Sequence, residues 1–231
     1  MKLNKKKLFV AALAISLVAI ISAGSLAWFS DSDEVTNNFY IATSEDDEPD
    51  EIFSIDVWEK TPDEDKDQDG HEYKDILPGD VLKKEVNVEN TGYYDQYVRV
   101  TVTVSDAAAW MGALNVTTAP RLDKITDWDA NGNWVDYSVE IVNDELVYVM
   151  YYKNILLGDQ DSMYDNAGVH QSVVTLFTKV MIPESMTVDQ AAAFKNNFAI
   201  NVKAEAVQTE NLGLDRTNGD GALEAFAKVG I

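Results

Sequence analysis

The sequence contains no cysteine, only two histidines and only five prolines among its 231 residues. If such a chain is exported, it has no disulfides and must be held together by packing alone. Its hydrophobic content of 46% is enough for a substantial core, and its length suits one domain, with or without insertions. The absence of cysteine therefore favours a large β-sandwich over a small disulfide-stapled extracellular module.

Basic residues are also scarce. The chain has 18 lysines and arginines against 40 aspartates and glutamates, a formal net charge of −22. Such a surface repels nucleic acid and anionic membranes, which excludes both as partners, and it attracts divalent cations and basic surfaces. It also makes identical subunits repel one another unless salt or bound cations screen the charge, which salt does over about 8 Å at physiological ionic strength.

Recognisable catalytic motifs are missing as well. The segment from His71 to Asp75 begins like a zinc-protease helix, but Asp75 stands where the second histidine of that motif is required. No Gly-x-Ser-x-Gly turn and no phosphate-binding glycine loop occurs. We therefore expect no catalytic residues, and we interpret His71 as a solvated loop residue.

The N-terminus contains a segment with a recognisable pattern. A lysine-rich start, an apolar run from Leu8 to Ala23 and a small-x-small ending predict a secretory signal peptide over residues 1–27. Ser25 and Ala27 would occupy the two small-residue positions before the cut, and Trp28 would become the new N-terminus. An uncleaved anchor is the alternative, but the run is short for a membrane span of roughly 20 residues. Contact with a membrane is thus expected only before cleavage.

Residues 28–51 are predicted to form an N-terminal strand followed by an acidic tether. Apolar residues alternate with polar ones over 35–41, which is the spacing of a half-buried strand. A run of acids over 45–51 then favours a solvated chain instead of a sheet. The residues that we expect to pair with a neighbouring subunit are Trp28, Phe29, Val35, Phe39 and Ile41.

Residues 52–231 are predicted to form one all-β domain, a jelly-roll-like antiparallel β-sandwich with short helical insertions. Turn signals separate short strands and there is no alternation of strands with helices, which argues against a parallel sheet. Two turns are specific: Pro78-Gly79 fits a type II turn, and Asn143-Asp144 fits a tight hairpin. Strands are expected over 52–59, 82–89, 97–105, 134–142, 145–153, 172–182 and 198–206, and helices over 107–114, 187–196 and 222–229.

An acidic loop over residues 61–75 is a candidate calcium site. Its carboxylates stand at alternate positions before Gly70, the arrangement by which one tight loop gathers oxygen ligands for a hard cation. The loop is incomplete, because Ile76 stands where a bidentate glutamate belongs, and Glu72 or Asp75 would have to substitute. An acidic loop without metal is the alternative. The candidate ligands are Asp63, Asp65, Asp67 and Asp69.

Two further patterns have a structural interpretation. Residues 127–132 show the same alternation of acidic and other residues before a glycine, but a plain turn is the better prediction there. Several aromatic residues could line a ligand surface, although in a sandwich such residues usually belong to the core or to cross-strand pairs. They are Trp128, Trp134, Tyr148, Tyr151 and Tyr152.

With these residues laid out, the chain resembles the TasA/camelysin family of secreted proteins of Gram-positive bacteria. The resemblance rests on the order of several short motifs along nearly the whole mature chain. They are residues 24–31 at the cut, Leu77-Pro78-Gly79-Asp80, Val88-Glu89-Asn90-Thr91-Gly92, Tyr151-Tyr152-Lys153 and residues 200–208. The resemblance implies processing by a SipW-type signal peptidase and a jelly-roll domain that polymerises into extracellular biofilm-matrix fibres.

In that family the N-terminal strand of one subunit completes the sheet of the next, so the expected partners are further copies of the chain and accessory matrix proteins. Two alternatives stay open. Camelysin-like members are described as metallopeptidases, which implies a secreted or cell-surface protease. The acidic loop implies a monomeric calcium-dependent surface-binding module, with calcium as the one cofactor.

Overall fold

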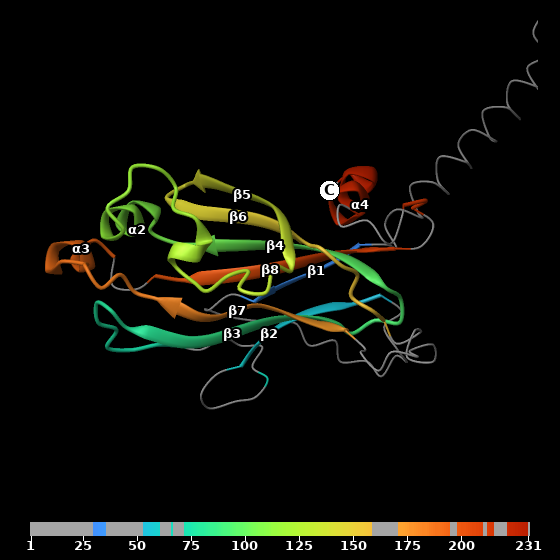
Figure 1. The fold of residues 1–231 in the computed structure, drawn as a ribbon, viewed down its shortest axis with the longest axis horizontal. Coiled ribbons are helices and arrows are strands. Elements are labelled where there is room, and N and C mark those ends of the chain that lie inside the picture. The colour runs from blue at the N-terminus through green and yellow to red at the C-terminus, as the bar shows by residue number, and fades with distance from the viewer. Residues whose placement is uncertain are drawn as a thin grey trace, which may run out of the picture.

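The structure, a computed structural model, describes residues 30–35, 53–60, 66, 72–158, 171–194, 198–209, 212–214 and 221–230. Within these ranges the chain forms eight strands in two antiparallel sheets, with short helices between them (Figure 1). The all-β class predicted from the sequence is thus confirmed. None of the helices in this part of the chain is long and apolar enough to cross a bilayer.

The larger sheet has five strands in the order β1-β8-β4-β6-β5. β4 is its central strand and pairs with both β8 and β6. Its valines at positions 98, 100, 102 and 104 are buried, while the residues between them are partly exposed, as the alternation predicts. The strands are β1 (Ser30–Val35), β8 (Ile200–Gln208), β4 (Gln96–Val104), β6 (Glu145–Tyr152) and β5 (Trp134–Val142).

The smaller sheet has three strands in the order β2 (Ile55–Lys60), β3 (Val81–Asn90) and β7 (Val173–Met181). Inward residues of both sheets belong to one hydrophobic cluster, so the sheets pack face to face around a common core. Each fully buried aliphatic side chain contributes about 1.5–3 kcal/mol relative to an exposed one. Because the chain has no disulfide, this packing holds the two layers together.

Both predicted turns are present. Asp80 donates its backbone N–H to the Leu77 carbonyl at 3.1 Å, and Gly79 has a φ of 88°, as a type II turn requires. Asn143 and Asp144 both have positive φ, 53° and 67°, so they form the two-residue connection between β5 and β6.

Helices lie at the two ends of the sandwich (Figure 1). At one end α2 (Ala107–Ala113) and α3 (Val188–Ala193) contact each other. Near the other end α4 (Gly221–Val229) packs on the larger sheet through Phe226, whose ring lies 4.6 Å from the Arg99 guanidinium. We call the first end, where β3 and β8 begin, the helical pole. We call the second end, which holds the β3–β4 turn at residues 91–95, the turn pole.

Candidate assembly edge

The N-terminal strand β1 forms an edge of the larger sheet. It pairs with β8 of the same chain in antiparallel register, with Ser30 opposite Val207 and Val35 opposite Val202. β8 runs from the helical pole to the turn pole, so β1 enters at the turn pole and ends toward the helical pole. The edge of β8 is therefore covered by the strand closest to the start of the chain.

The covered stretch of β8 is apolar and small on its core face. Val202, Ala204 and Ala206 are buried, whereas Lys203 and Glu205 alternate with them and are partly exposed. The register sets Asp31 and Asp33 opposite the two alanines. The register thus sets two acidic positions opposite a small, apolar part of the edge.

β1 also closes one long side of the sandwich. It contacts β2 of the opposite sheet, and Figure 1 shows it lying between β8 and that sheet. If β1 left, the outward main-chain groups of β8 would be unpaired, and an unpaired edge is a template for another strand. The side of the sandwich that β1 covers is therefore a potential assembly site.

The opposite long side is closed by an internal segment, residues 120–128. Thr126 forms a bridge with Val180 of β7, and Met181 donates its N–H to the Ile125 carbonyl at 2.7 Å. Asp127 completes this cover, because its carboxylate accepts from the Thr178 N–H at 2.7 Å, the Thr178 hydroxyl at 2.6 Å and the Lys179 N–H at 3.0 Å. The free edge of β7 is thus occupied by its own chain.

The charge state of Asp127 supports this role. Partial burial raises the pKa of its carboxyl, but the hydrogen bonds from Thr178 and Lys179 outweigh burial and hold the pKa below 3.8. The carboxylate is therefore ionised, and an acceptor, over the whole physiological pH range.

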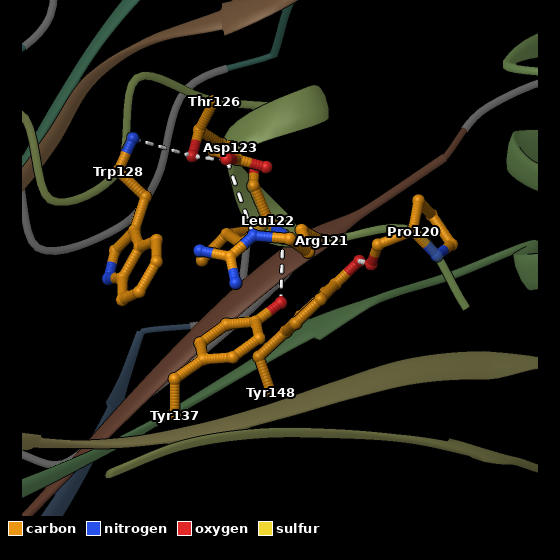
Figure 2. A network of polar contacts seen from close by, with 8 residues as sticks. All are labelled: Pro120, Arg121, Leu122, Asp123, Thr126, Trp128, Tyr137 and Tyr148. Atoms are coloured by element: carbon orange, nitrogen blue, oxygen red, sulfur yellow. Dashed lines mark hydrogen bonds and ion pairs between the residues drawn. The ribbon is translucent and has the colours of Figure 1, made fainter. Parts of the chain in front are cut away.

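Figure 2 shows how the 120–128 segment is anchored to the larger sheet. The Tyr148 hydroxyl donates to the Pro120 carbonyl at 3.0 Å, and the Leu122 N–H donates to the Tyr137 hydroxyl at 2.9 Å. The Arg121 guanidinium lies 5.2 Å from the centre of the Tyr137 ring. Burial raises the pKa of both tyrosines, so their hydroxyls stay protonated and the anchor persists at any physiological pH.

The aromatic residues considered as a ligand surface belong to the core. Trp128, Trp134, Tyr148 and Tyr152 are all at least nine-tenths buried. Trp128 packs on Tyr137 with ring centres 4.7 Å apart. Four of the five candidates are thus taken up by packing, and the fifth, Tyr151, packs against Phe226 of α4.

The acidic stretch over residues 127–132 is a plain turn, as predicted. Gly132 donates its N–H to the Asp129 carbonyl at 2.9 Å, and both residues have positive φ. The Asp129 carboxylate accepts from the Trp134 N–H at 3.1 Å. Both carboxylates of this stretch therefore serve the fold.

The proposed calcium ligands Asp63, Asp65, Asp67 and Asp69 lie outside the described residues, so the calcium site stays a prediction. Lys66, which stands among them, pairs with Glu89 at 2.7 Å and lies 5.5 Å from the centre of the Trp58 ring. Glu72 and Asp75 are exposed. In the ranges that the structure covers, no three His, Cys, Asp or Glu residues are grouped so that they could hold a metal.

The protease-like segment does not form the helix that the zinc motif needs. Residues 72–76 are irregular, and the Tyr73 hydroxyl donates to the Lys83 carbonyl, which ties this loop to β3. His71 and His170 lie outside the described residues.

The segment assigned to pairing with a neighbour is covered only in part. Ser25, Ala27, Trp28, Phe29, Phe39 and Ile41 lie outside the described residues, and Val35 is the last residue of β1. The observed strand therefore precedes the one expected over 35–41 and shares Val35 with it. Hydrophobic periodicity could not have found β1, because Ser30 to Glu34 are all polar and this strand is defined by main-chain pairing.

Sequence reasoning also missed a buried ion pair between the sheet residues Lys84 and Glu59, whose side chains are 2% and 1% exposed. Both charges look like ordinary surface residues in a chain with 25% charged residues. Comparison of the chain with protein-family models, with curated proteins and with solved structures found no match in any of the three.

Proposed function

We propose that this chain is a secreted structural protein that polymerises into extracellular biofilm-matrix fibres. Each subunit, a jelly-roll-like β-sandwich, donates its N-terminal strand to the β8 edge of the next. One observation carries the proposal: β1 is an edge strand joined to the rest of the sandwich only through residues 36–52. An element attached in this way can be exchanged between identical copies at low cost, because the exchanged strand remakes the same main-chain hydrogen bonds.

The length of the connection supports exchange. Residues 36–52 are about 17 residues, which reach up to roughly 60 Å when extended. β1 can therefore leave its own β8 without strain on the chain at β2, although it gives up its contacts with β2. Residues 45–51 contain six acids, a composition that disfavours packing onto an acidic domain.

The sequence after β1 offers a better partner for β8 than β1 itself. Sliding the strand by six residues sets Asn37, Phe39 and Ile41 at the register positions of Asp31, Asp33 and Val35. An even slide keeps the same set of positions on the core face. Burying a phenylalanine and an isoleucine there contributes about 1.5–3 kcal/mol each. A donated strand in this register would bind β8 more tightly than β1 binds the β8 of its own subunit.

Processing and charge would control when exchange occurs. The leader holds residues 28–42 at the membrane until a SipW-type peptidase cuts before Trp28. Loss of the leader, with its four lysines and no acid, lowers the formal net charge from −22 to about −26. We therefore expect calcium or mild acid to promote assembly, because either reduces the repulsion between copies. Accessory matrix proteins are further expected partners.

The test compares the mature chain, beginning at Trp28, with a truncation that lacks residues 28–42. The mature chain should form fibres in electron micrographs. The truncation should keep its far-ultraviolet circular dichroism but stay monomeric, and a synthetic peptide of residues 28–42 should bind it one to one. Normal fibres from the truncation, or a mature chain that stays monodisperse at high concentration, would refute the proposal. The metallopeptidase and calcium-dependent binding alternatives stay predictions, since no observation favours them.

A further inference from the structure

A cavity of about 790 Å³ lies between the layers at the helical pole. Most of the residues that line it are apolar, but about half of its exposed wall is polar, and the exposed residues Glu72, Lys74 and Asp75 line its outer part, so it reaches the surface there. Sites that bind ligands or partner side chains typically measure about 300–1,000 Å³. The apolar residues that define it best are Leu82, Trp110, Ile182, Phe194, Phe198 and Ile200.

Three aromatic side chains form the inner part of this cavity. Trp110 is completely buried, and its ring meets Phe194 and Phe198 edge to face at 5.3 Å and 5.1 Å. The two phenylalanines are only partly buried, so they, and not the enclosed indole, form the aromatic surface that a side chain entering the cavity would meet.

The rest of the helical pole exposes large apolar side chains. Val188 of α3 is 84% exposed, and Leu77 and Val81, at the start of β3, are 64% and 61% exposed. These are the three most exposed large hydrophobic residues in the parts of the chain that the structure describes. They lie on the same two segments, α3 and the start of β3, that contribute residues to the cavity, so this pole concentrates exposed apolar side chains, as protein contact sites do.

The turn pole exposes a tyrosine that has the size and chemistry to enter the cavity of the helical pole. Tyr93, in the β3–β4 turn, is 46% exposed. Its turn is rigid, because Asn90 accepts from the Gly92 N–H at 2.9 Å and donates to the carbonyls of Tyr94 and Leu156 at 2.9 and 3.1 Å. Gly92 itself packs so closely that an added Cβ would lie 2.6 Å from the Ser54 nitrogen. A tyrosine on a rigid turn can anchor an interface at small entropic cost.

The length of the connection between β1 and β2, within residues 36–52, limits which poles can meet in a fibre. The first described residue after it, Phe53, lies at the turn pole beside β2, whereas β1 ends toward the helical pole. A donated strand therefore ends near the helical pole of the acceptor, while its own domain resumes at the turn pole of the donor. In the register that uses Phe39 and Ile41 only residues 42–52 remain as the connection, and these reach at most roughly 40 Å. The connection is shortest when these two poles abut. With the opposite poles abutting it would have to pass two sandwiches of roughly 30 Å each, which exceeds that reach.

We infer that the turn pole of each donor docks on the helical pole of its acceptor, with Tyr93 of the donor inserted into the acceptor's cavity. The occupant of this apolar surface is thus a second copy of the chain. The Tyr93 ring packs on the partly buried rings of Phe194 and Phe198, and its hydroxyl stays near the polar outer part of the cavity. This inference rests on the proposed strand exchange, and it adds a second contact, which sets the direction of stacking.

Cross-linking tests the contact, because the chain has no native cysteine. The full chain carrying Thr91→Cys, an exposed position in the same turn as Tyr93, and Lys74→Cys is secreted by a Gram-positive host, assembled and treated with a short bismaleimide. Each copy then keeps Tyr93 and carries one thiol at each pole, so a ladder of dimers, trimers and larger species is expected. The control pairs Thr91→Cys with Ser138→Cys, an exposed position in the middle of β5, and should give no ladder. In addition, Tyr93→Ser should raise the critical concentration for assembly about tenfold, whereas Tyr93→Phe should retain most of the affinity.

The outcomes separate this inference from the proposed function. If fibres form, and the Lys74 pair gives a ladder while the Ser138 control gives none, the result supports both the strand exchange and the pole contact. Fibres without that ladder, or with an equal ladder from the Ser138 control, overturn the pole contact and leave strand exchange standing. Assembly of Tyr93→Ser at the wild-type concentration also overturns it. If the processed wild-type chain forms no fibres, the proposed function fails and this inference fails with it.

Discussion

Replacing Asp127 by alanine should weaken the fold and open a second sheet edge. The carboxylate accepts three hydrogen bonds of 2.6–3.0 Å from Thr178 and Lys179. A typical hydrogen bond contributes about 1 kcal/mol net, and partial exposure lets water replace some of the loss. We therefore expect the free energy of unfolding to fall by roughly 2 kcal/mol, and the melting temperature by roughly 4–8 °C for a domain of this size.

The pH dependence of the same variant gives an independent check. The folded-state pKa of Asp127 is depressed, so its contribution is complete above the unfolded value of 3.8 and is lost as the pH falls through the folded pKa. The difference in unfolding free energy between wild type and Asp127→Ala should be constant near neutrality and shrink below about pH 4. Urea titrations at several pH values measure it.

Asp123→Ala is the matched control, because the Asp123 carboxylate has only a 3.4 Å contact with the exposed Arg121. That substitution should change stability by less than about 0.5 kcal/mol. In electron micrographs Asp127→Ala should also give bundled or branched material, because the β7 edge becomes able to pair. If Asp127→Ala and Asp123→Ala unfold at the same urea concentration, the cover over β7 does not depend on this carboxylate.

Three further predictions concern α4, the donated strand and the charge. Phe226→Ala should cost about 3–4 kcal/mol, because its ring is buried and contacts both Tyr151 and Arg99; a loss below 1 kcal/mol in urea titration would contradict this packing. Phe39→Asp should slow fibre growth at least tenfold in light scattering without changing monomer stability; unchanged growth would exclude the register that uses Phe39. Calcium should accelerate assembly, and calorimetry should show that Asp67→Ala removes its binding; equal calcium binding by both proteins would exclude the acidic loop.

The parts of the fold that follow from local physics could be predicted from the sequence. The alternation of valines along β4 fixes which face is buried. The Pro78-Gly79 turn and the Asn143-Asp144 hairpin need only the dihedral preferences of their own residues. The limits of β2 to β8 were predicted to within about three residues, because polar turn residues interrupt each apolar pattern.

The elements that depend on partners distant in sequence could not be predicted. β1 is polar, and only its register on β8, far away in the chain, makes it a strand. Asp127 was correctly placed in a turn, but its hydrogen bonds to β7 come from residues about 50 positions later. The cavity combines α2, α3 and the loop before β3, three segments whose proximity no periodicity reveals.

The two long sides of the sandwich differ in how they are closed, one by the internal segment 120–128 and one by the terminal strand β1. In the proposed filament this difference would give a direction, because each copy would donate one strand and accept one, and the two ends would be chemically distinct. An incoming copy would first have to release its own β1, and that step would set a lag. A short preformed seed should therefore abolish the lag and elongate from a single end.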